Sequence, residues 1–458
     1  MTGPTTRADI VVVGMGVGGE AVAGSLAEAG LDVVGIEAEL VGGECPYWGC
    51  IPSKMMIRAA NLIAEASRIP GMSGTVDVRP DWTPVADRIR HEATDDWNDQ
   101  VAVDRFTGKG GRFVRGAATV LGPRSVSVEG VGVIEARRGI VLATGTSSVA
   151  PPIDGLADTP FWTNREAVSA KDLPASLVVL GGGAIGVEIG QAFARFEVEV
   201  TVVEAAERIL PAEEPEVSAL LADTFRSEGI TVLAGRAATQ VGYAGGTFAI
   251  RLDNGDDVTA EGLLVATGRR PQVAPEMLRA LELEPGLRAL PVDERMRVAD
   301  GVWAVGDVTG KGAFTHVATY QADLVVADVL GRPTPEAEYR ALPRVTFTDP
   351  EVGSVGLSEA QAREQGLAVA VGTANLQHTA RGWLHKAGSH GLIKLVMDTD
   401  TGLLVGATSA GPVGGEVLGA LAVAIHGRVP VEQLRHMIWA YPTFHRGIQD
   451  ALRDLPIG

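Results

Sequence analysis

The sequence contains little cysteine and no long apolar run. Only 2 of its 458 residues are cysteines, which excludes a secreted scaffold held together by many disulfides. Its apolar stretches are interrupted within about ten residues, whereas a membrane-spanning helix needs about 20. The apolar run at residues 9–14 ends in a glycine and is too short for a signal peptide. We therefore expect a cytoplasmic protein.

Positive charge is also in short supply. The chain has 39 Lys and Arg against 57 Asp and Glu, which gives a formal net charge of −18. A general nucleic-acid binder needs a basic surface, and anionic membranes repel an acidic one. Neither nucleic acid nor membrane is expected as a partner. Small anionic ligands stay open, because helix N-termini bind them whatever the net charge.

A strand–helix–strand pattern occurs twice, each time with a glycine motif after the first strand. The strands are expected at 8–13 and 32–36 in the first copy, and at 177–180 and 197–203 in the second. In both copies an acid follows the first glycine by 23 residues (14 to 37 and 181 to 204). The motif residues are Gly14, Gly16, Gly19 and Glu37 in the first copy, and Gly181, Gly183, Gly186 and Glu204 in the second.

This spacing is typical of dinucleotide-binding folds. The first glycine makes the turn, the second lets a pyrophosphate approach the backbone, and the third lets the helix pack on the strand. The acid accepts hydrogen bonds from a ribose. Each copy also has a later strand ending in Ala-Thr-Gly, at 141–145 and 264–268. Two copies predict two dinucleotides, which suggests a hydride donor and a bound flavin.

The final part of the chain has a different pattern. Short strands at 343–347, 391–398 and 402–410 alternate with helices at 358–365, 413–426 and 443–453. We predict an α/β fold with two Rossmann-like dinucleotide-binding domains and a separate C-terminal α+β domain. Proline-rich breaks divide the chain into predicted parts at 1–150, 151–271, 272–338 and 339–458.

Both cysteines lie in the segment from Gly42 to Lys54, which reads GGECPYWGCIPSK. Five residues of straight helix would separate their Cα atoms by about 7.5 Å, beyond the roughly 4.4–6.8 Å of a disulfide. We expect Pro46 and Gly49 to break the helix and bring Cys45 and Cys50 into bonding range. A helix from about residue 52 to 67 would place Cys50 near its N-terminus, which favours a thiolate.

The chain resembles the class I pyridine nucleotide–disulfide oxidoreductases, the family of dihydrolipoamide dehydrogenase, glutathione reductase and mercuric reductase. The resemblance lies in residues 42–54, in AVGD at 304–307 and in FTDPEVG at 347–353, and it covers essentially the whole chain. It implies an FAD-dependent NAD(P)H oxidoreductase that forms a homodimer. The four predicted parts would then be FAD-binding, NAD(P)-binding, FAD-binding again and dimerisation.

The resemblance also implies roles for individual residues. Cys50 would be the thiol next to the flavin, and Cys45 the outer thiol that meets the acceptor. Lys54 would lie near flavin N5 and pair with Glu188. Glu37 would bind the adenosine ribose. The further cofactor-binding residues that it implies are Gly43, Gly116, Ala117, Thr144, Gly145, Gly268, Asp307 at the ribitol and Ala318 at the pyrimidine edge.

Glu204 bears on the choice of hydride donor. A carboxylate at this strand end accepts hydrogen bonds from both ribose hydroxyls and would repel a 2′-phosphate. Its neighbours are Ala205, Ala206 and Glu207, and the next cation is Arg208. We expect NAD as the second cofactor, with NADP as the alternative, and no resident metal.

The C-terminal segment departs from the family pattern. Disulfide reductases carry H-P-T-x-x-E there, whose His is the base for the outer thiol, whereas this chain reads YPTFHR from Tyr441. Tyr441 stands at the His position and Arg446 at the Glu position. A phenol with a pKa near about 10 is a poor base at neutral pH. His445 is the other candidate for proton transfer.

Three functions stay open at this stage. The first is electron transfer from NADH through FAD and a Cys45–Cys50 disulfide to a small-molecule acceptor, without the usual His–Glu pair. The second is a mercuric or other metal-ion reductase, or a disulfide reductase like dihydrolipoamide dehydrogenase. Standard mercuric reductases end in a vicinal cysteine pair, whereas this chain ends in DLPIG. The third is a redox sensor with slow turnover.

Overall fold

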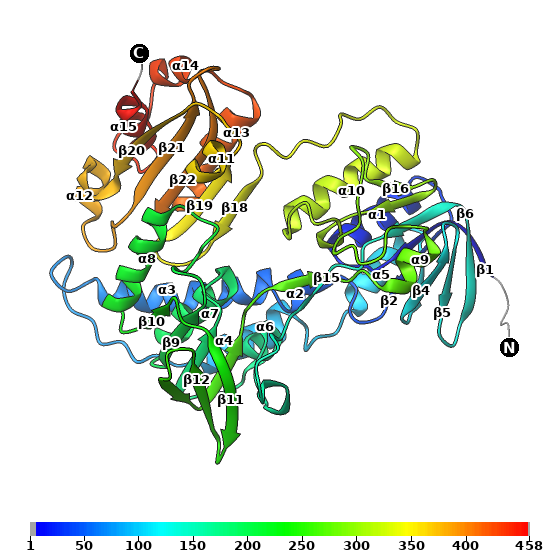
Figure 1. Cartoon of the computed structure of the whole chain (residues 1–458), viewed down its shortest axis with the longest axis horizontal. Helices are drawn as coiled ribbons and strands as arrows, with labels where there is room; N and C mark the ends of the chain where they lie inside the picture. The colour runs from blue at the N-terminus through cyan, green and yellow to red at the C-terminus, as the bar shows by residue number, and fades with distance from the viewer. Residues whose placement is uncertain (1–5, 457–458) are drawn as a thin grey trace. The chain divides into compact units, whose positions relative to one another are not determined.

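The computed structural model describes residues 6–456, which group into two compact units. One unit contains the chain up to Pro52 together with residues 87–149 and 268–338. The other contains residues 53–86, residues 150–267 and the chain from Tyr339 onward (Figure 1). The four-part division made from the sequence stays a prediction.

The first unit is built on an eight-stranded sheet. Its main path runs β16-β17-β6-β1-β2-β3, and β4 and β5 extend it from β6. Strands β17, β6, β1, β2 and β3 are parallel, as a nucleotide-binding fold requires. The strands are β1 (Thr6–Val13), β2 (Val33–Glu37), β3 (Arg112–Arg115), β4 (Ala118–Gly122), β5 (Ser125–Val128), β6 (Gly132–Leu142), β16 (Arg297–Ala299) and β17 (Val302–Ala304).

Strand β1 is apolar at every position from Ile10 to Val13 because both faces of its sheet are covered. Ile10 and Val12 pack in one core with helices α1 and α10, whereas Val11 and Val13 pack in a second core on the opposite face. The helices of the first unit are α1 (Val17–Glu28), α2 (Glu44–Tyr47), a π-helix (Ile89–Ala93), α5 (Gln100–Gly108), α9 (Pro275–Ala280) and α10 (Thr315–Val329). A two-stranded ribbon of β7 (Thr146–Ser148) and β15 (Arg269–Pro271) lies at its edge.

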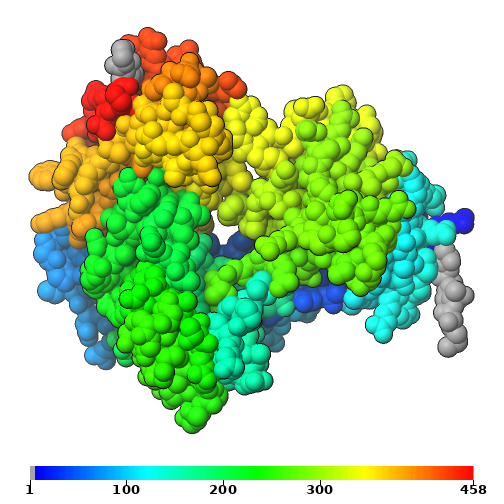
Figure 2. All heavy atoms as spheres, in the orientation of Figure 1, coloured from blue at the N-terminus to red at the C-terminus, as the bar shows by residue number. Residues whose placement is uncertain are grey.

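The second unit repeats this topology. Its parallel sheet runs β10-β9-β8-β14, with a three-stranded antiparallel sheet of β11, β12 and β13 before the last strand. The turn between β11 and β12 is the green tip in Figure 2. The elements are β8 (Ser176–Leu180), β9 (Glu199–Glu204), β10 (Thr231–Ala234), β11 (Ala238–Ala244), β12 (Thr247–Leu252), β13 (Asp257–Ala260), β14 (Gly262–Val265), α6 (Asn164–Ser169), α7 (Ala184–Ala194) and α8 (Pro215–Ser227).

The end of the chain forms a five-stranded antiparallel sheet in the order β18-β19-β22-β21-β20. Helices α13 and α15 bury their apolar faces on it, with Leu418, Leu421, Ile448 and Leu452 in the shared core. The elements are β18 (Pro343–Thr346), β19 (Glu351–Gly356), β20 (Val369–Asn375), β21 (Leu392–Asp398), β22 (Leu403–Gly411), α11 (Glu359–Glu364), α12 (Ala380–His385), α13 (Gly414–His426), α14 (Val431–His436) and α15 (Gly447–Asp454). The predicted fold class is confirmed.

Local structure around the cysteines differs from the expectation in one respect. Pro46 does not break a helix, because it lies in the first turn of α2, where its missing N–H is not needed. The break comes at Trp48 and Gly49, and α3 (Cys50–Ser67) then begins at Cys50 itself. Helix α4 (Thr83–Arg88) follows α3.

None of the helices in residues 6–456 combines the length and the apolar character that a bilayer crossing requires.

Candidate functional site

The first glycine motif closes against the end of β6. A Cβ on Gly14 would lie 2.3 Å from the carbonyl oxygen of Ala143, and a Cβ on Gly19 would lie 2.0 Å from that of Gly14. Both positions therefore exclude any larger residue. The Glu37 carboxylate accepts hydrogen bonds from the backbone N–H groups of Met15 (2.7 Å) and Glu39 (2.8 Å). A carboxylate has about four acceptor sites, so Glu37 keeps capacity for a ribose.

The second motif has the same geometry. A Cβ on Gly181 would lie 2.5 Å from the carbonyl oxygen of Ala266, and a Cβ on Gly186 would lie 2.0 Å from that of Gly181. The Glu204 carboxylate accepts from the backbone N–H groups of Gly182 (2.6 Å) and Ala206 (2.7 Å). The internal duplication thus extends to individual hydrogen bonds.

Both motifs leave space for a phosphate. A Cβ on Gly183 would meet no atom within 4 Å, and one on Gly16 would meet only the Cα of Gly43, at 3.9 Å. Each glycine caps a helix, α1 or α7, whose first N–H groups can bind an anion. The residues present therefore fit a dinucleotide at each motif.

Further predicted cofactor-binding residues of the first unit lie just after the ends of its parallel strands. Gly116 donates its N–H to the carbonyl of Glu37 (2.9 Å) and precedes Ala117. The Thr144 hydroxyl donates to the carbonyl of Gln272 (2.9 Å), and Gly145 accepts from the N–H of Gln272 (2.9 Å).

Asp307 and Ala318 complete this set. The Asp307 carboxylate accepts from the hydroxyl of Thr146 (2.8 Å), and burial raises the pKa of Asp307. Thr146 in turn accepts from Arg269 (2.9 Å). Ala318 is buried on α10 beneath Gly18. Thr146 and Arg269 were not predicted, because only the fold brings them to Asp307.

The cysteine loop is held against the first glycine motif. A Cβ on Gly43 would lie 2.8 Å from the Cα of Gly16, and Gly42 forms an isolated bridge with Gly16. Gly43 also has a φ of 69°, which glycine adopts readily. The backbone just before Cys45 therefore lies in contact with the expected pyrophosphate loop.

Cys45 and Cys50 are both free thiols, and both are half-buried. The Sγ atom of Cys50 lies 3.4 Å from the hydroxyl of Thr315, the first residue of α10. The pKa of the Cys45 thiol is raised, chiefly because it donates a hydrogen bond to Cys50 and also because it is buried. The pair therefore keeps a proton on Cys45. The Thr315 contact was not predicted, since nothing local connects residues 50 and 315.

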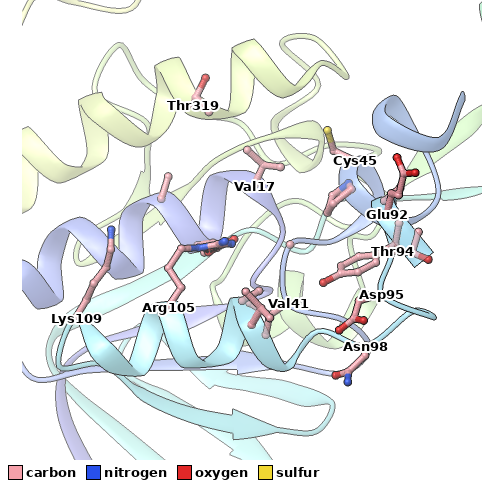
Figure 3. A pocket seen from close by; sticks show the side chains of 18 residues that line it. Val17, Val41, Cys45, Glu92, Thr94, Asp95, Asn98, Arg105, Lys109 and Thr319 are labelled. Atoms are coloured by element: carbon pink, nitrogen blue, oxygen red, sulfur yellow. Dashed lines mark hydrogen bonds and ion pairs between the residues drawn. The ribbon is translucent and has the colours of Figure 1, made fainter. Parts of the chain in front are cut away.

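A cavity of about 540 Å³ opens beside Cys45, a volume that suits a small molecule. Its walls come from α1, the loop at 41–47, the turn at 92–98, α5 and Thr319 of α10. In Figure 3, Cys45 is drawn between Val17 of α1 and Glu92 of the π-helix, and its sulfur points away from Thr94 and Asp95. The Glu20 carboxylate in this wall pairs with Arg105 at 2.5 Å.

In the second unit, Lys54 and Glu188 form the expected pair. The Lys54 ammonium donates to Glu188 (2.9 Å) and lies 4.4 Å from the centre of the Phe347 ring. The Glu188 carboxylate also accepts from the backbone N–H of Phe347 (2.8 Å), and its side chain is 8% exposed. Their predicted place beside a flavin stays a prediction.

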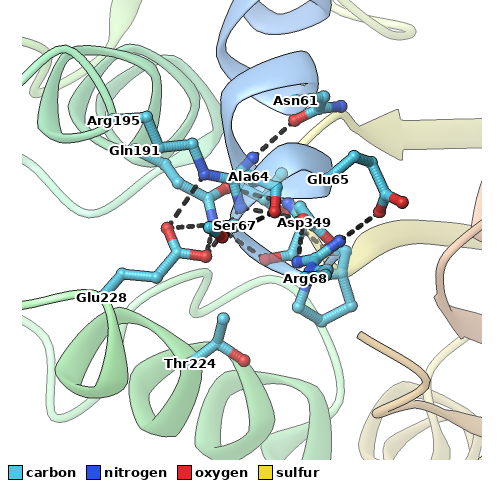
Figure 4. A network of polar contacts seen from close by, with 12 residues as sticks. Asn61, Ala64, Glu65, Ser67, Arg68, Gln191, Arg195, Thr224, Glu228 and Asp349 are labelled. Carbon is cyan, nitrogen blue, oxygen red and sulfur yellow. Dashed lines mark hydrogen bonds and ion pairs between the residues drawn. The ribbon is translucent and has the colours of Figure 1, made fainter. Parts of the chain in front are cut away.

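Helix α7 carries Glu188 and Gln191, and Arg195 caps its C-terminal end. Gln191 bonds both the N–H (2.8 Å) and the carbonyl (2.7 Å) of Asp349. Arg195 bonds the Asp349 carboxylate (2.8 Å), Glu228 and Asn61 (Figure 4). The FTDPEVG segment noted in the sequence is thus fixed to α7 by three side chains.

The C-terminal candidates lie on a segment of the second unit in which Tyr441 is exposed and His445 is half-buried. Tyr441 is 68% exposed, and the guanidinium of Arg446 lies 5.5 Å from the centre of its ring. His445 packs against Trp439, with ring centroids 6.1 Å apart. These contacts assign neither Tyr441 nor His445 a role in proton transfer. Within residues 6–456, no cluster of three or more His, Cys, Asp or Glu is arranged to hold a metal.

Two arginines, Arg208 and Arg236, lie near Glu204 in sequence or in the fold. Arg208 donates to the carbonyl oxygens of Pro211 and Glu213, at 2.9 Å each. Arg236 follows β10, the strand next to β9, and its N–H donates to the carbonyl of Glu204 (3.0 Å). Arg236 was missed because it is 32 residues from Glu204 (204 to 236).

Comparison with known proteins now decides the family. Residues 8–322 match the family described as pyridine nucleotide-disulphide oxidoreductase, and residues 342–452 match its dimerisation domain. The chain belongs to this family of flavin-dependent oxidoreductases. The chain is an oxidoreductase, carries the family's dimerisation domain, and has relatives that use FAD and NAD(P)H.

Three relatives illustrate the range of the family. The chain is 33% identical to a mercuric reductase of Acidithiobacillus ferrooxidans, over 96% of this chain and 81% of that protein. It is 32% identical to a dihydrolipoyl dehydrogenase of Halobacterium salinarum, over 98% and 96% of the two chains. The structure of the HOCl-induced flavoprotein disulfide reductase RclA from Escherichia coli matches with a TM-score of 0.84 at 27% identity, over 98% and 99%.

We expect Glu188→Ala to lower the free energy of unfolding by about 1–3 kcal/mol, because it leaves the partly buried N–H of Phe347 without its acceptor. Glu188→Gln keeps an oxygen for that N–H and loses only the charge, so its loss should be smaller. The matched control is the exposed Glu207→Ala, expected within about 0.5 kcal/mol of wild type. Denaturant unfolding of the four proteins checks this. Equal stability of the two Glu188 variants would contradict it.

Proposed function

We propose that this chain passes electrons from NADH through a bound FAD to the Cys45–Cys50 pair, and from there to a small-molecule acceptor. The observation that carries the proposal is the contact of the cysteine loop with the first glycine motif, through Gly43 and Gly16. FAD, when bound, supplies two-electron transfer between a hydride donor and a disulfide. The family membership supports both cofactors.

In this proposal the first unit holds FAD. Gly14, Gly16 and Gly19 form the phosphate loop, Glu37 accepts from the ribose, and Asp307 accepts from the ribitol. The carboxyl ends of β1 and β2 place the loop and Glu37 at one edge of the sheet. The second unit holds NADH in the same way, through Gly181 to Gly186 and Glu204.

The two thiols then have different tasks. Cys50 begins α3, and the N-terminus of a helix stabilises a thiolate there. The hydroxyl of Thr315 can donate a hydrogen bond to that sulfur. Cys45 keeps its proton and lines the cavity, so it is the thiol that meets the acceptor.

The acceptor is proposed to be a metal ion or another electrophile rather than an ordinary disulfide. Disulfide exchange needs a base that takes the proton from Cys45, and Tyr441 and Arg446 replace the usual His and Glu. Related proteins include mercuric reductases and a Cu(II) complex of RclA, which matches this chain at 26% identity with a TM-score of 0.85. We also propose a homodimer, formed through the dimerisation domain.

For the hydride donor, we expect NADH to exceed NADPH at least about tenfold in kcat/KM, which is ~1.4 kcal/mol of discrimination. The reason is the Glu204 carboxylate together with the engagement of Arg208 by backbone carbonyls. Glu204→Ala should reduce the preference. The control, Glu207→Ala, should leave it unchanged. Steady-state rates with both donors measure this, and equal kcat/KM values in the wild type would contradict it.

For the acceptor, we expect lipoamide and glutathione disulfide to react about 10²–10⁴-fold more slowly than in relatives that have the base. Because the pKa of Cys45 is raised, little thiolate exists at neutral pH, and these rates should climb steadily from pH 6 to pH 9. Tyr441→His combined with Arg446→Glu should raise the neutral rate more than Tyr441→His alone.

A screen of NADH oxidation with lipoamide, glutathione disulfide, Hg(II), Cu(II) and quinones tests the acceptor. Rapid lipoamide reduction with a flat pH profile would contradict the missing base and make His445 the leading candidate. No steady oxidation with any acceptor would favour the redox sensor instead.

A further inference from the structure

An aromatic stack contacts the loop between the two cysteines. The indole of Trp48 stacks on that of Trp97, with ring centroids 5.4 Å apart and planes 21° from parallel. The indole N–H of Trp97 donates to the backbone carbonyl of Tyr47 at 3.3 Å. Trp97 therefore contacts both residues at the centre of the Cys45–Cys50 segment.

The turn that presents Trp97 has an unusual backbone. Asp95, Asp96 and Trp97 all have positive φ angles, of 47°, 54° and 57°, although none of them is glycine. The turn directly follows the π-helix Ile89–Ala93 and its C-cap Thr94. Left-handed non-glycine residues and π-helical turns are both sparsely populated, and both concentrate at functional sites.

Polar contacts hold this turn in place. Arg90, in the π-helix, forms an ion pair with Asp96 at 2.5 Å, and its guanidinium lies 5.1 Å from the centre of the Trp97 ring. The N–H of Asp96 donates to the carbonyl of Arg90 at 2.6 Å. Through Arg90, the π-helix thus holds the turn and the Trp97 indole in position.

The segment that Trp97 contacts has a tight fold of its own. After Trp48 the chain doubles back at Gly49, where a Cβ would lie 3.2 Å from the carbonyl oxygen of Glu44 and 3.6 Å from the Cα of Cys45. Glycine is the most flexible residue, so this fold needs support in the dithiol state, when no S–S bond holds it. The stack on Trp48 supplies that support one residue away.

We propose that Trp97 is a positioning residue, which holds the Cys45–Cys50 loop in its closed form in the dithiol state and thereby favours the disulfide. This inference rests on the proposed function, in which the pair cycles. On oxidation both S–H bonds break, one S–S bond forms, and two electrons and two protons pass to the acceptor. A loop already held closed loses less conformational entropy in that step, so the disulfide forms more readily.

The test is a redox equilibrium on the intact holoenzyme. The protein is equilibrated in glutathione buffers, in which glutathione disulfide takes up the two electrons and two protons and yields two glutathiones. Alkylation followed by mass spectrometry gives the dithiol fraction. We expect Trp97→Ala to favour the dithiol by about tenfold in the equilibrium constant, which is about 30 mV for a two-electron couple.

Three variants sharpen the result. Trp97→Phe keeps a stacked ring and should stay near the wild-type equilibrium. Trp48→Ala removes the same stack from the other side, so it should give the same shift, and it carries the test if Trp97→Ala fails to fold. The control is Trp383→Ala, whose side chain is 76% exposed on α12 and should have no effect.

The outcomes separate the two ideas. A wild-type equilibrium in folded Trp97→Ala or Trp48→Ala, or a shift toward the disulfide, would overturn the role of Trp97 while the proposed function stands. A wild type that forms no Cys45–Cys50 disulfide at any glutathione ratio would overturn both. If the stack is the cause, the double variant should shift no further than either single one.

Discussion

The close approach of Gly16 and Gly43 is the constraint on which the first unit depends. A Cβ on Gly43 would lie only 2.8 Å from the Cα of Gly16, so a side chain there would push the cysteine loop away from the first glycine motif. The consequences follow in order along the chain. Gly43 caps α2, which carries Cys45, and after the break at Gly49 the next helix starts with Cys50. One backbone contact thus places the two thiols beside the first glycine motif.

The two glycine motifs have the same local packing and hydrogen bonds. In both units the first glycine packs on a carbonyl of the Ala-Thr-Gly strand, and the acid accepts from the N–H of the residue after that glycine. The units then diverge. In the first, Asp307 and the cysteine loop lie near the motif, whereas in the second α7 and its C-cap present Glu188, Gln191 and Arg195 to the segment at 347–349. The same fold therefore carries two different sets of side-chain contacts.

Much of this could be predicted from the sequence, because its signals are local. Glycine spacing, apolar strands and the GGECPYWGC segment each specify structure within a few residues, and the glycine motifs, the parallel strands and the start of α3 lie where they were expected, within about two residues. Pro46 was misjudged because a proline in the first turn of a helix and one in its interior look alike in sequence.

Other features depend on contacts that local patterns do not encode. Thr315 lies 265 residues from Cys50, and Trp97 lies 49 residues from Trp48 (48 to 97). The left-handed turn at Asp95, Asp96 and Trp97 contains no glycine, so nothing in its sequence indicates this backbone. The Arg90 ion pair and the stack on Trp48 stabilise the turn instead. Short strands such as β4, β5 and β11 were not predicted either, since each buries only one or two residues and so shows no clear apolar pattern.

The central claim is that electrons from NADH reach the Cys45–Cys50 pair. Counting reactive thiols per chain in the oxidised holoenzyme, before and after one equivalent of NADH without oxygen, tests it most directly. We predict that the count rises from zero to two, and that peptide mapping places both thiols at Cys45 and Cys50. Two reactive thiols before NADH is added, or none after it, would contradict the account.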